Sequence, residues 1–83
     1  MSPPDDHATD PILVDARDLP CPIPVLKARR VLAAAAPGDI VEVRTTDPAA
    51  PADFRGFCDA AGHRLLSVDE AGGEAVIRII RAG

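Results

Sequence analysis

The chain has 83 residues, of which 47% are hydrophobic, so it can build one small domain around a single core. Its formal net charge is −4, and aromatic residues make up only 2% of the sequence. A nucleic-acid-binding domain needs cations for phosphates and aromatic side chains for bases, so this composition argues against direct binding of nucleic acid. No apolar stretch approaches the ~18 residues that span a bilayer, and the first residues lack a signal-peptide pattern. We therefore expect a cytoplasmic protein with no membrane partner.

The first half of the chain predicts a tail, a strand, a helix and a second strand. Residues 1–11 are polar, acidic and proline-containing, and we expect them to be disordered ahead of one folded domain, 12–83. The apolar run 12–14 predicts a short strand. Apolar residues then recur at helical spacing over 22–36, where a Pro-Gly pair would end the helix. The β-branched run 40–45 predicts the next strand.

The second half predicts one more helix and a hairpin. Pro51 can open the helix, and Gly62 is placed to end it. Segments 64–68 and 75–80 predict two strands, joined by the glycine-containing connection 69–73. The resulting order is β-α-β-α-β-β. Because crossovers between parallel strands are right-handed, we expect both helices on one face of a mixed four-stranded sheet, a two-layer α/β sandwich of the α+β class.

The most informative motif is Cys21-Pro22-Ile23-Pro24, which comes directly at the start of the first predicted helix. Proline is favoured at the first helical position, so the pattern predicts Cys21 as the N-cap residue, at the positive end of the helix dipole. Pro22 and Pro24 lack an N–H group, which leaves the Ile23 amide as the donor that can reach the sulfur. We therefore expect an exposed thiol with a pKa below ~8 that acts as a nucleophile.

Cationic residues flank this motif and predict a locally positive environment that would favour the thiolate; they are Arg17, Lys27, Arg29 and Arg30. A candidate docking surface for acidic partner proteins consists of Arg17, Leu26, Lys27 and Arg30. The other interpretation of these residues is an ordinary solvated helix face. Since no C-x-x-C motif is present, the cysteine suits accepting and handing on an atom better than a self-contained redox reaction.

The remaining cysteine and histidine have structural interpretations. Cys58 shares an apolar helical stripe with Phe54 and Phe57, so we expect it in the core and not as a resolving thiol for Cys21. A zinc site built from Cys21, Cys58 and His63 matches no known ligand spacing and lacks a fourth ligand. We therefore expect no metal and no cofactor, and we expect His63 to be solvated.

Two aspartates near the second helix also have local interpretations. We expect Asp47 to form the turn before this helix and Asp53 to favour its first turn, because carboxylates suit both positions. His7 falls in the predicted tail and is expected to be solvated.

The stretch from Val14 to Ala28, which contains the cysteine motif, resembles the signature of the TusA/SirA family of sulfur-carrier proteins. The similarity continues through Pro37-Gly38, Asp47-Pro48, Asp53-Phe54 and Gly62-His63. It implies a two-layer sandwich of the kind seen in the C-terminal domain of a bacterial translation initiation factor. One position departs from the family, since Asp18 stands where glycine is usual. If this position requires a positive φ, aspartate tolerates it less well than glycine.

The resemblance also implies that Cys21 carries sulfur as a persulfide in a relay between proteins. Family members accept sulfur from a cysteine desulfurase or a rhodanese and pass it to a downstream acceptor protein. Their destinations include tRNA thiolation, molybdenum-cofactor enzymes and sulfur oxidation. We therefore expect a sulfurtransferase-type carrier. The alternative is a non-catalytic regulatory module of the same fold in which Cys21 senses redox state. Nothing in the sequence requires a dimer, so we expect a monomer.

Overall fold

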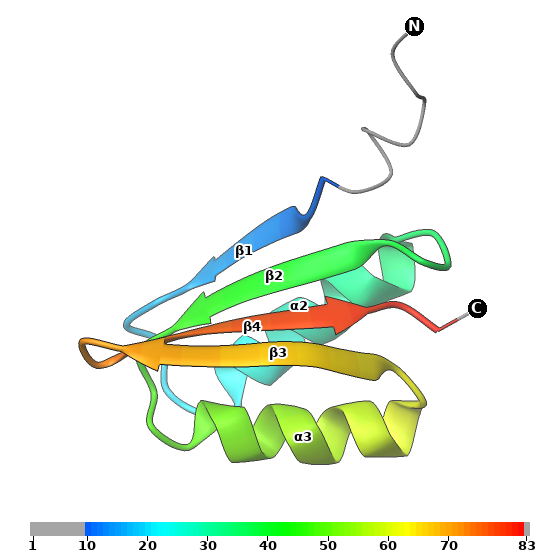
Figure 1. Cartoon of the computed structure of the whole chain (residues 1–83). Coiled ribbons are helices and arrows are strands. Elements are labelled where there is room, and N and C mark those ends of the chain that lie inside the picture. The colour runs from blue at the N-terminus through cyan, green and yellow to red at the C-terminus, as the bar shows by residue number, and fades with distance from the viewer. Residues whose placement is uncertain (1–9, 83) are drawn as a thin grey trace, which may run out of the picture.

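The computed structural model describes residues 10–82 and contains four strands and two helices in the predicted order (Figure 1). Their bounds are β1 Ile12–Ala16, α2 Ile23–Ala34, β2 Ile40–Thr45, α3 Ala50–Ala61, β3 Arg64–Ala71 and β4 Glu74–Ile80. The predicted tail, residues 1–11, lies almost entirely outside the described residues, and so does His7. No helix within 10–82 is long and apolar enough to cross a membrane.

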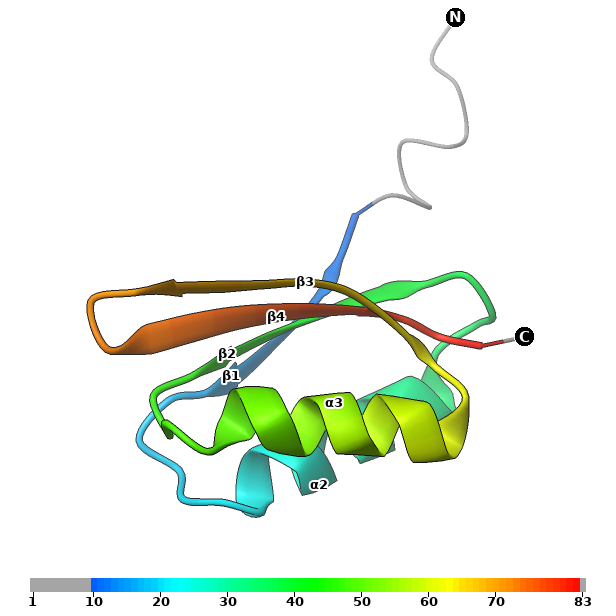
Figure 2. The same ribbon diagram turned by 60° about the horizontal axis from the view of Figure 1, so that its bottom comes forward.

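The strands form one mixed sheet in the order β1-β2-β4-β3. β1 and β2 are parallel, with Ile12 opposite Val41, whereas β4 is antiparallel to both of its neighbours, β2 and β3. Both helices lie against the same face of the sheet, as Figure 2 shows from a second direction. The two-layer α+β sandwich predicted from the sequence is therefore confirmed.

The core lies between the helices and the inner face of the sheet. Side chains alternate between the two faces of a strand, so β4 buries Ala75, Ile77 and Ile79. From α3, Phe54 is fully buried and Cys58 is 2% exposed, which confirms the prediction that Cys58 is a core residue. The other apolar residues of the buried cluster are Val14, Ala16, Ala28, Leu32, Val41, Val43 and Ala50.

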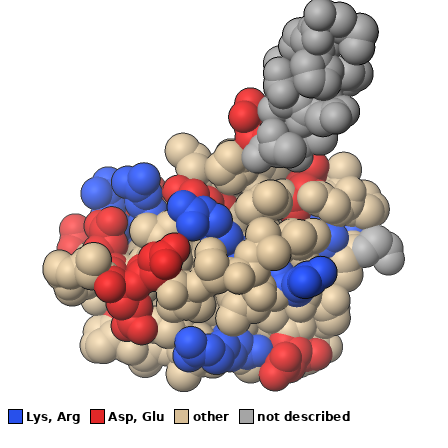
Figure 3. All heavy atoms as spheres, viewed as in Figure 1, with Lys and Arg blue, Asp and Glu red and all other residues tan. Residues whose placement is uncertain are grey.

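The opposite face of the sheet, which neither helix covers, carries charged side chains that pair with one another. Arg78 Nε lies 2.9 Å from a carboxylate oxygen of the buried Glu42, and Arg78 Nη1 lies 3.2 Å from Asp69. Arg44 lies 3.7 Å from Glu42. Figure 3 shows acidic and basic side chains interspersed on this side of the molecule. The two arginines and the two carboxylates therefore neutralise one another on this face of the sheet.

The structure moves several predicted boundaries, and the hairpin differs most. β3 continues to Ala71, so the turn is Gly72-Gly73 and not the predicted connection 69–73. Both glycines have a positive φ, 60° and 78°, the conformation that two-residue hairpin turns require. The end of α3 at Gly62, with φ of 80°, is as predicted.

Candidate functional site

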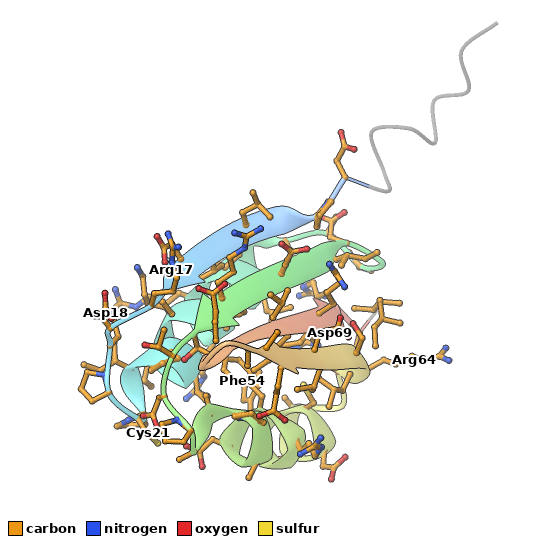
Figure 4. All side chains as sticks on the ribbon, turned by 60° about the vertical axis from the view of Figure 1, so that its left-hand side comes forward. Arg17, Asp18, Cys21, Phe54, Arg64 and Asp69 are labelled. Carbon is orange, nitrogen blue, oxygen red and sulfur yellow. The ribbon has the colours of Figure 1, made fainter. Side chains whose placement is uncertain are left out.

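Cys21 lies in the loop between β1 and α2, at the end of the molecule where both helices begin (Figure 4). Because β1 and β2 are parallel, the loops that follow them leave the same edge of the sheet. The Asp18 amide donates to Thr46 Oγ1 at 2.8 Å, and the Cys21 amide donates to the Asp47 carboxylate. These two hydrogen bonds hold the cysteine loop against the loop that leads into α3.

The entrance to α2 differs from the predicted geometry. The helix begins at Ile23 with Pro22 as its N-cap residue and no side-chain cap, and the Cys21–Pro22 peptide bond is cis. The Ile23 amide donates to the Pro20 carbonyl at 2.9 Å, so a tight turn uses the donor that was expected to reach the sulfur. The predictions that Cys21 is the N-cap residue and that Ile23 donates to its sulfur are therefore wrong. Pro24 lies in the first turn of the helix and is buried.

The Cys21 thiol is exposed and faces carboxylates instead of cations. Its Sγ donates a hydrogen bond to Oδ2 of Asp53, a half-buried residue in the first turn of α3. This hydrogen bond, together with partial desolvation and the negative charges of Asp53 and Asp47, raises the pKa of the Cys21 thiol from 9.0 to about 11. The predicted pKa below ~8 is therefore wrong, because a carboxylate that accepts the thiol proton stabilises the protonated form and repels the thiolate.

Two of the cations that flank the cysteine motif, Arg17 and Lys27, contact Asp15 near the end of β1. Arg17 forms a two-point ion pair with Asp15, with distances of 2.9 Å from Nε and 3.0 Å from Nη2 to the carboxylate oxygens. This pair holds the pKa of the Asp15 carboxyl well below its usual range. Lys27 Nζ donates to the backbone carbonyl of Asp15 at 3.2 Å. The groups that set the pKa of the thiol are Asp53 and Asp47, so the predicted positive environment is replaced by a negative one.

The outer face of α2 forms a shallow groove of about 510 Å³, which we call the α2 groove. It is lined by Ile23, Leu26, Lys27, Arg29, Arg30 and Ala33. Two apolar members are strongly exposed, Ile23 at 40% and Leu26 at 49%. The structure thus brings three predicted docking residues, Leu26, Lys27 and Arg30, onto one surface, whereas Arg17 lies outside this lining.

Cys58 and His63 occupy structural positions. Burial raises the pKa of the Cys58 thiol to about 11, which makes it a poor nucleophile as well as an inaccessible one. His63 is half-buried, and its Nδ1 accepts a hydrogen bond from the Ala82 amide at 2.9 Å, so the prediction of a solvated His63 is wrong. Its ring centroid lies 5.8 Å from that of Phe57. No group of three or more potential metal ligands occurs within residues 10–82.

Asp47 and Asp53 do serve the start of α3, but their contacts with Cys21 were not expected from the sequence. The Asp47 carboxylate accepts from the Ala49 amide at 2.9 Å, and Asp53 is the acidic residue of the first helical turn. The predicted topology contains a signal for the contacts with Cys21. Parallel pairing of the first two strands places both following loops at one edge, where side chains from either loop can meet.

Fold and site together define a small α+β domain that presents a cysteine thiol at its surface, beside an apolar and cationic helix face. The sequence profile of the family described as "Sulfurtransferase TusA" matches residues 12–81. The chain belongs to this family of sulfur carriers, and the resemblance seen in the cysteine motif is confirmed.

Individual relatives agree with this assignment. The sulfur carrier protein TusA of Pseudomonas aeruginosa is 39% identical over 67 residues, which are 81% of this chain and 84% of that protein. The sulfur carrier protein TusA of Allochromatium vinosum is 38% identical over 61 residues, 74% of this chain and 80% of that protein. The crystal structure of a SirA-like protein from Desulfitobacterium hafniense superposes with a TM-score of 0.75 at 23% identity, covering 87% of this chain and 99% of the other. This likeness supports the fold.

Proposed function

We propose that Cys21 carries sulfur as a persulfide between a donor protein, a cysteine desulfurase or a rhodanese, and a downstream acceptor protein. In the encounter the Cys21 thiol releases its proton to solvent, and the resulting thiolate attacks the terminal sulfur of the donor persulfide. A new S–S bond forms at Cys21, the S–S bond in the donor breaks, and the donor cysteine leaves as a thiolate. One sulfur atom changes carrier, and the exchange needs no external oxidant or reductant.

The observation that carries this proposal is the exposed Cys21 thiol at the junction of two helix starts, in a chain of the sulfur-carrier family. An exposed sulfur can enter the active site of a second protein, as a relay requires. Burial keeps Cys58 from competing for the sulfur.

The α2 groove is the surface that we propose for partner docking. It lies on the helix that follows Cys21 and combines exposed Ile23 and Leu26 with the charges of Lys27, Arg29 and Arg30. A surface that combines apolar side chains with cations suits a partner surface that combines apolar and acidic side chains. Arg17 follows β1 and lines a pocket next to Lys27, so it can contact a partner docked there, but its guanidinium is paired with Asp15 and adds little net charge.

The test is loading by a purified cysteine desulfurase with cysteine as substrate, followed by mass spectrometry under non-reducing conditions. Wild type and a Cys58→Ser variant should each gain one sulfur, and a Cys21→Ser variant should gain none. Failure of wild type to load from desulfurase and rhodanese donors would favour the alternative, a regulatory module in which Cys21 senses redox state. The downstream pathway and the cytoplasmic location stay predictions.

A further inference from the structure

Cys21 is tied to two carboxylates that belong to a different part of the fold. Its thiol donates to Asp53 in α3, and its amide donates to Asp47 in the loop before α3. The one acidic residue on its own loop, residues 17–22, is Asp18, whose amide donates to Thr46. On α2, Lys27 donates to the backbone carbonyl of Asp15. The charges that the thiol meets across the interface with α3 are therefore negative.

This arrangement keeps the proton on the sulfur of the free protein. A carboxylate is a far weaker base than a thiolate, so it accepts a hydrogen bond from the S–H group without removing the proton. A thiolate formed at this place would lose that hydrogen bond and face two negative charges. The contact with Asp53 therefore suppresses the nucleophilic form of Cys21, although the side chain is exposed.

We propose that Asp53, supported by Asp47, acts as a lock on the free Cys21 thiol, and that a sulfur donor releases the lock by placing a cationic side chain against these carboxylates. The proposal rests on the proposed carrier function and adds the kind of partner group that starts the transfer. Neutralising Asp53 removes the repulsion, so that the thiol can release its proton to solvent and become a thiolate. Loading itself replaces the S–H bond with an S–S bond, so Sγ no longer donates to Asp53 and the lock acts on the free thiol alone.

The size of the effect follows from the shift in pKa. A return of the thiol pKa from about 11 to 9.0 would raise the thiolate fraction at neutral pH about 100-fold. The intrinsic nucleophilicity of a thiolate falls with its pKa, with a Brønsted coefficient of about 0.4–0.5, which offsets about a factor of ten. The net expectation is a roughly tenfold faster reaction of Cys21 with a small neutral electrophile.

The first arm of the experiment measures alkylation of Cys21 by iodoacetamide at pH 7.4, with mass spectrometry to separate Cys21 from Cys58. Asp53→Asn should react about tenfold faster than wild type, and Asp53→Glu, which keeps the carboxylate, should return the rate towards that of wild type. Asp59→Asn is the matched control, because it removes one exposed charge from the same helix. A change of less than twofold in folded Asp53→Asn, or an equal gain in Asp59→Asn, would overturn the lock.

The second arm compares a protein donor with a small one. Loading from inorganic polysulfide should accelerate about tenfold in Asp53→Asn, whereas loading by the desulfurase should change far less, because the donor already neutralises Asp53 in wild type. A merely structural role would move both rates together, and that result would overturn the proposal. If Asp53→Asn does not fold, the pH dependence of Cys21 alkylation in wild type decides. A midpoint at or below pH 9 contradicts the lock, and a midpoint near pH 11 supports it.

The two proposals fail in different ways. In one outcome, wild type fails to load from any protein donor while Asp53→Asn still accelerates alkylation. The carrier function and the release of the lock by a donor's cationic side chain are then both wrong, but Asp53 does suppress the Cys21 thiolate. If wild type loads and the pKa of Cys21 does not respond to Asp53, the lock is wrong and the carrier function stands.

Discussion

Replacing Asp18 by glycine should stabilise the fold, because Asp18 holds a backbone conformation that suits glycine better. Its φ is 63°, in the left-handed region, which costs an ordinary L-residue roughly 1–2 kcal/mol. Glycine avoids this cost but loses more backbone freedom on folding, which returns about 0.5–1 kcal/mol. The net expectation for Asp18→Gly is a gain of about 0.5–1 kcal/mol in the free energy of unfolding.

Equilibrium urea unfolding measures this gain. With an m value of about 1 kcal/mol/M for a domain of this size, the midpoint should rise by about 0.5–1 M. The control is Asp18→Ala, which keeps an L-residue at positive φ but loses the short polar side chain that tolerates this region. Both variants retain the amide that donates to Thr46 Oγ1. An Asp18→Gly protein no more stable than wild type, or an Asp18→Ala protein equally stabilised, would mean that the positive φ of Asp18 does not destabilise the fold.

Three further predictions concern the motif, the thiols and the α2 groove. Pro24→Ala removes two buried methylene groups and should lower the free energy of unfolding by about 1.5 kcal/mol, measured by urea unfolding. A loss below about 0.5 kcal/mol would mean that the proline ring adds little to the core. Alkylation of native protein should label the exposed Cys21 before the buried Cys58. The rate for Cys21 should rise about tenfold per pH unit from 7 to 10, because its pKa is raised to about 11. Earlier labelling of Cys58 would contradict the assignment of Cys21 as the accessible thiol. Lys27→Glu with Arg30→Glu should slow loading by a desulfurase at low salt and leave iodoacetamide reactivity nearly unchanged, and unchanged loading would mean that partners dock elsewhere.

Most of the fold could be predicted from the sequence because its signals are local. Helical spacing of apolar residues, the glycine at the end of α3 and the β-branched run of β2 each depend on neighbouring residues. The sequence pattern predicts too wide a hairpin turn, because the pairing of β3 with β4 up to Ala71 opposite Glu74 depends on the partner strand. The predicted exposure of Cys21 and burial of Cys58 are both found in the structure.

The electrostatics of the site could not be read from neighbouring residues. Asp47 and Asp53 lie 26 and 32 positions from Cys21 in the sequence. The parallel pairing of β1 with β2 brings together the segments that follow these two strands, and with them the cysteine and the two carboxylates. The cations that are close in sequence lie elsewhere in space, as the ion pair of Arg17 with Asp15 shows. The missing N–H group of Pro24 is evident from the sequence, whereas the burial of its ring in the core is not.

The most direct test of the account is a single-turnover relay. Cys21 would be loaded with radioactive sulfur from a desulfurase and labelled cysteine, the donor removed, and the loaded chain mixed with an acceptor of the same pathway. We expect one labelled sulfur per chain, found on the Cys21 peptide and released by reducing agent. It should be lost from this chain at the same rate as it appears on the acceptor. Label on Cys58, or label on Cys21 that no acceptor protein removes, would contradict the proposal that this chain is a carrier working through Cys21.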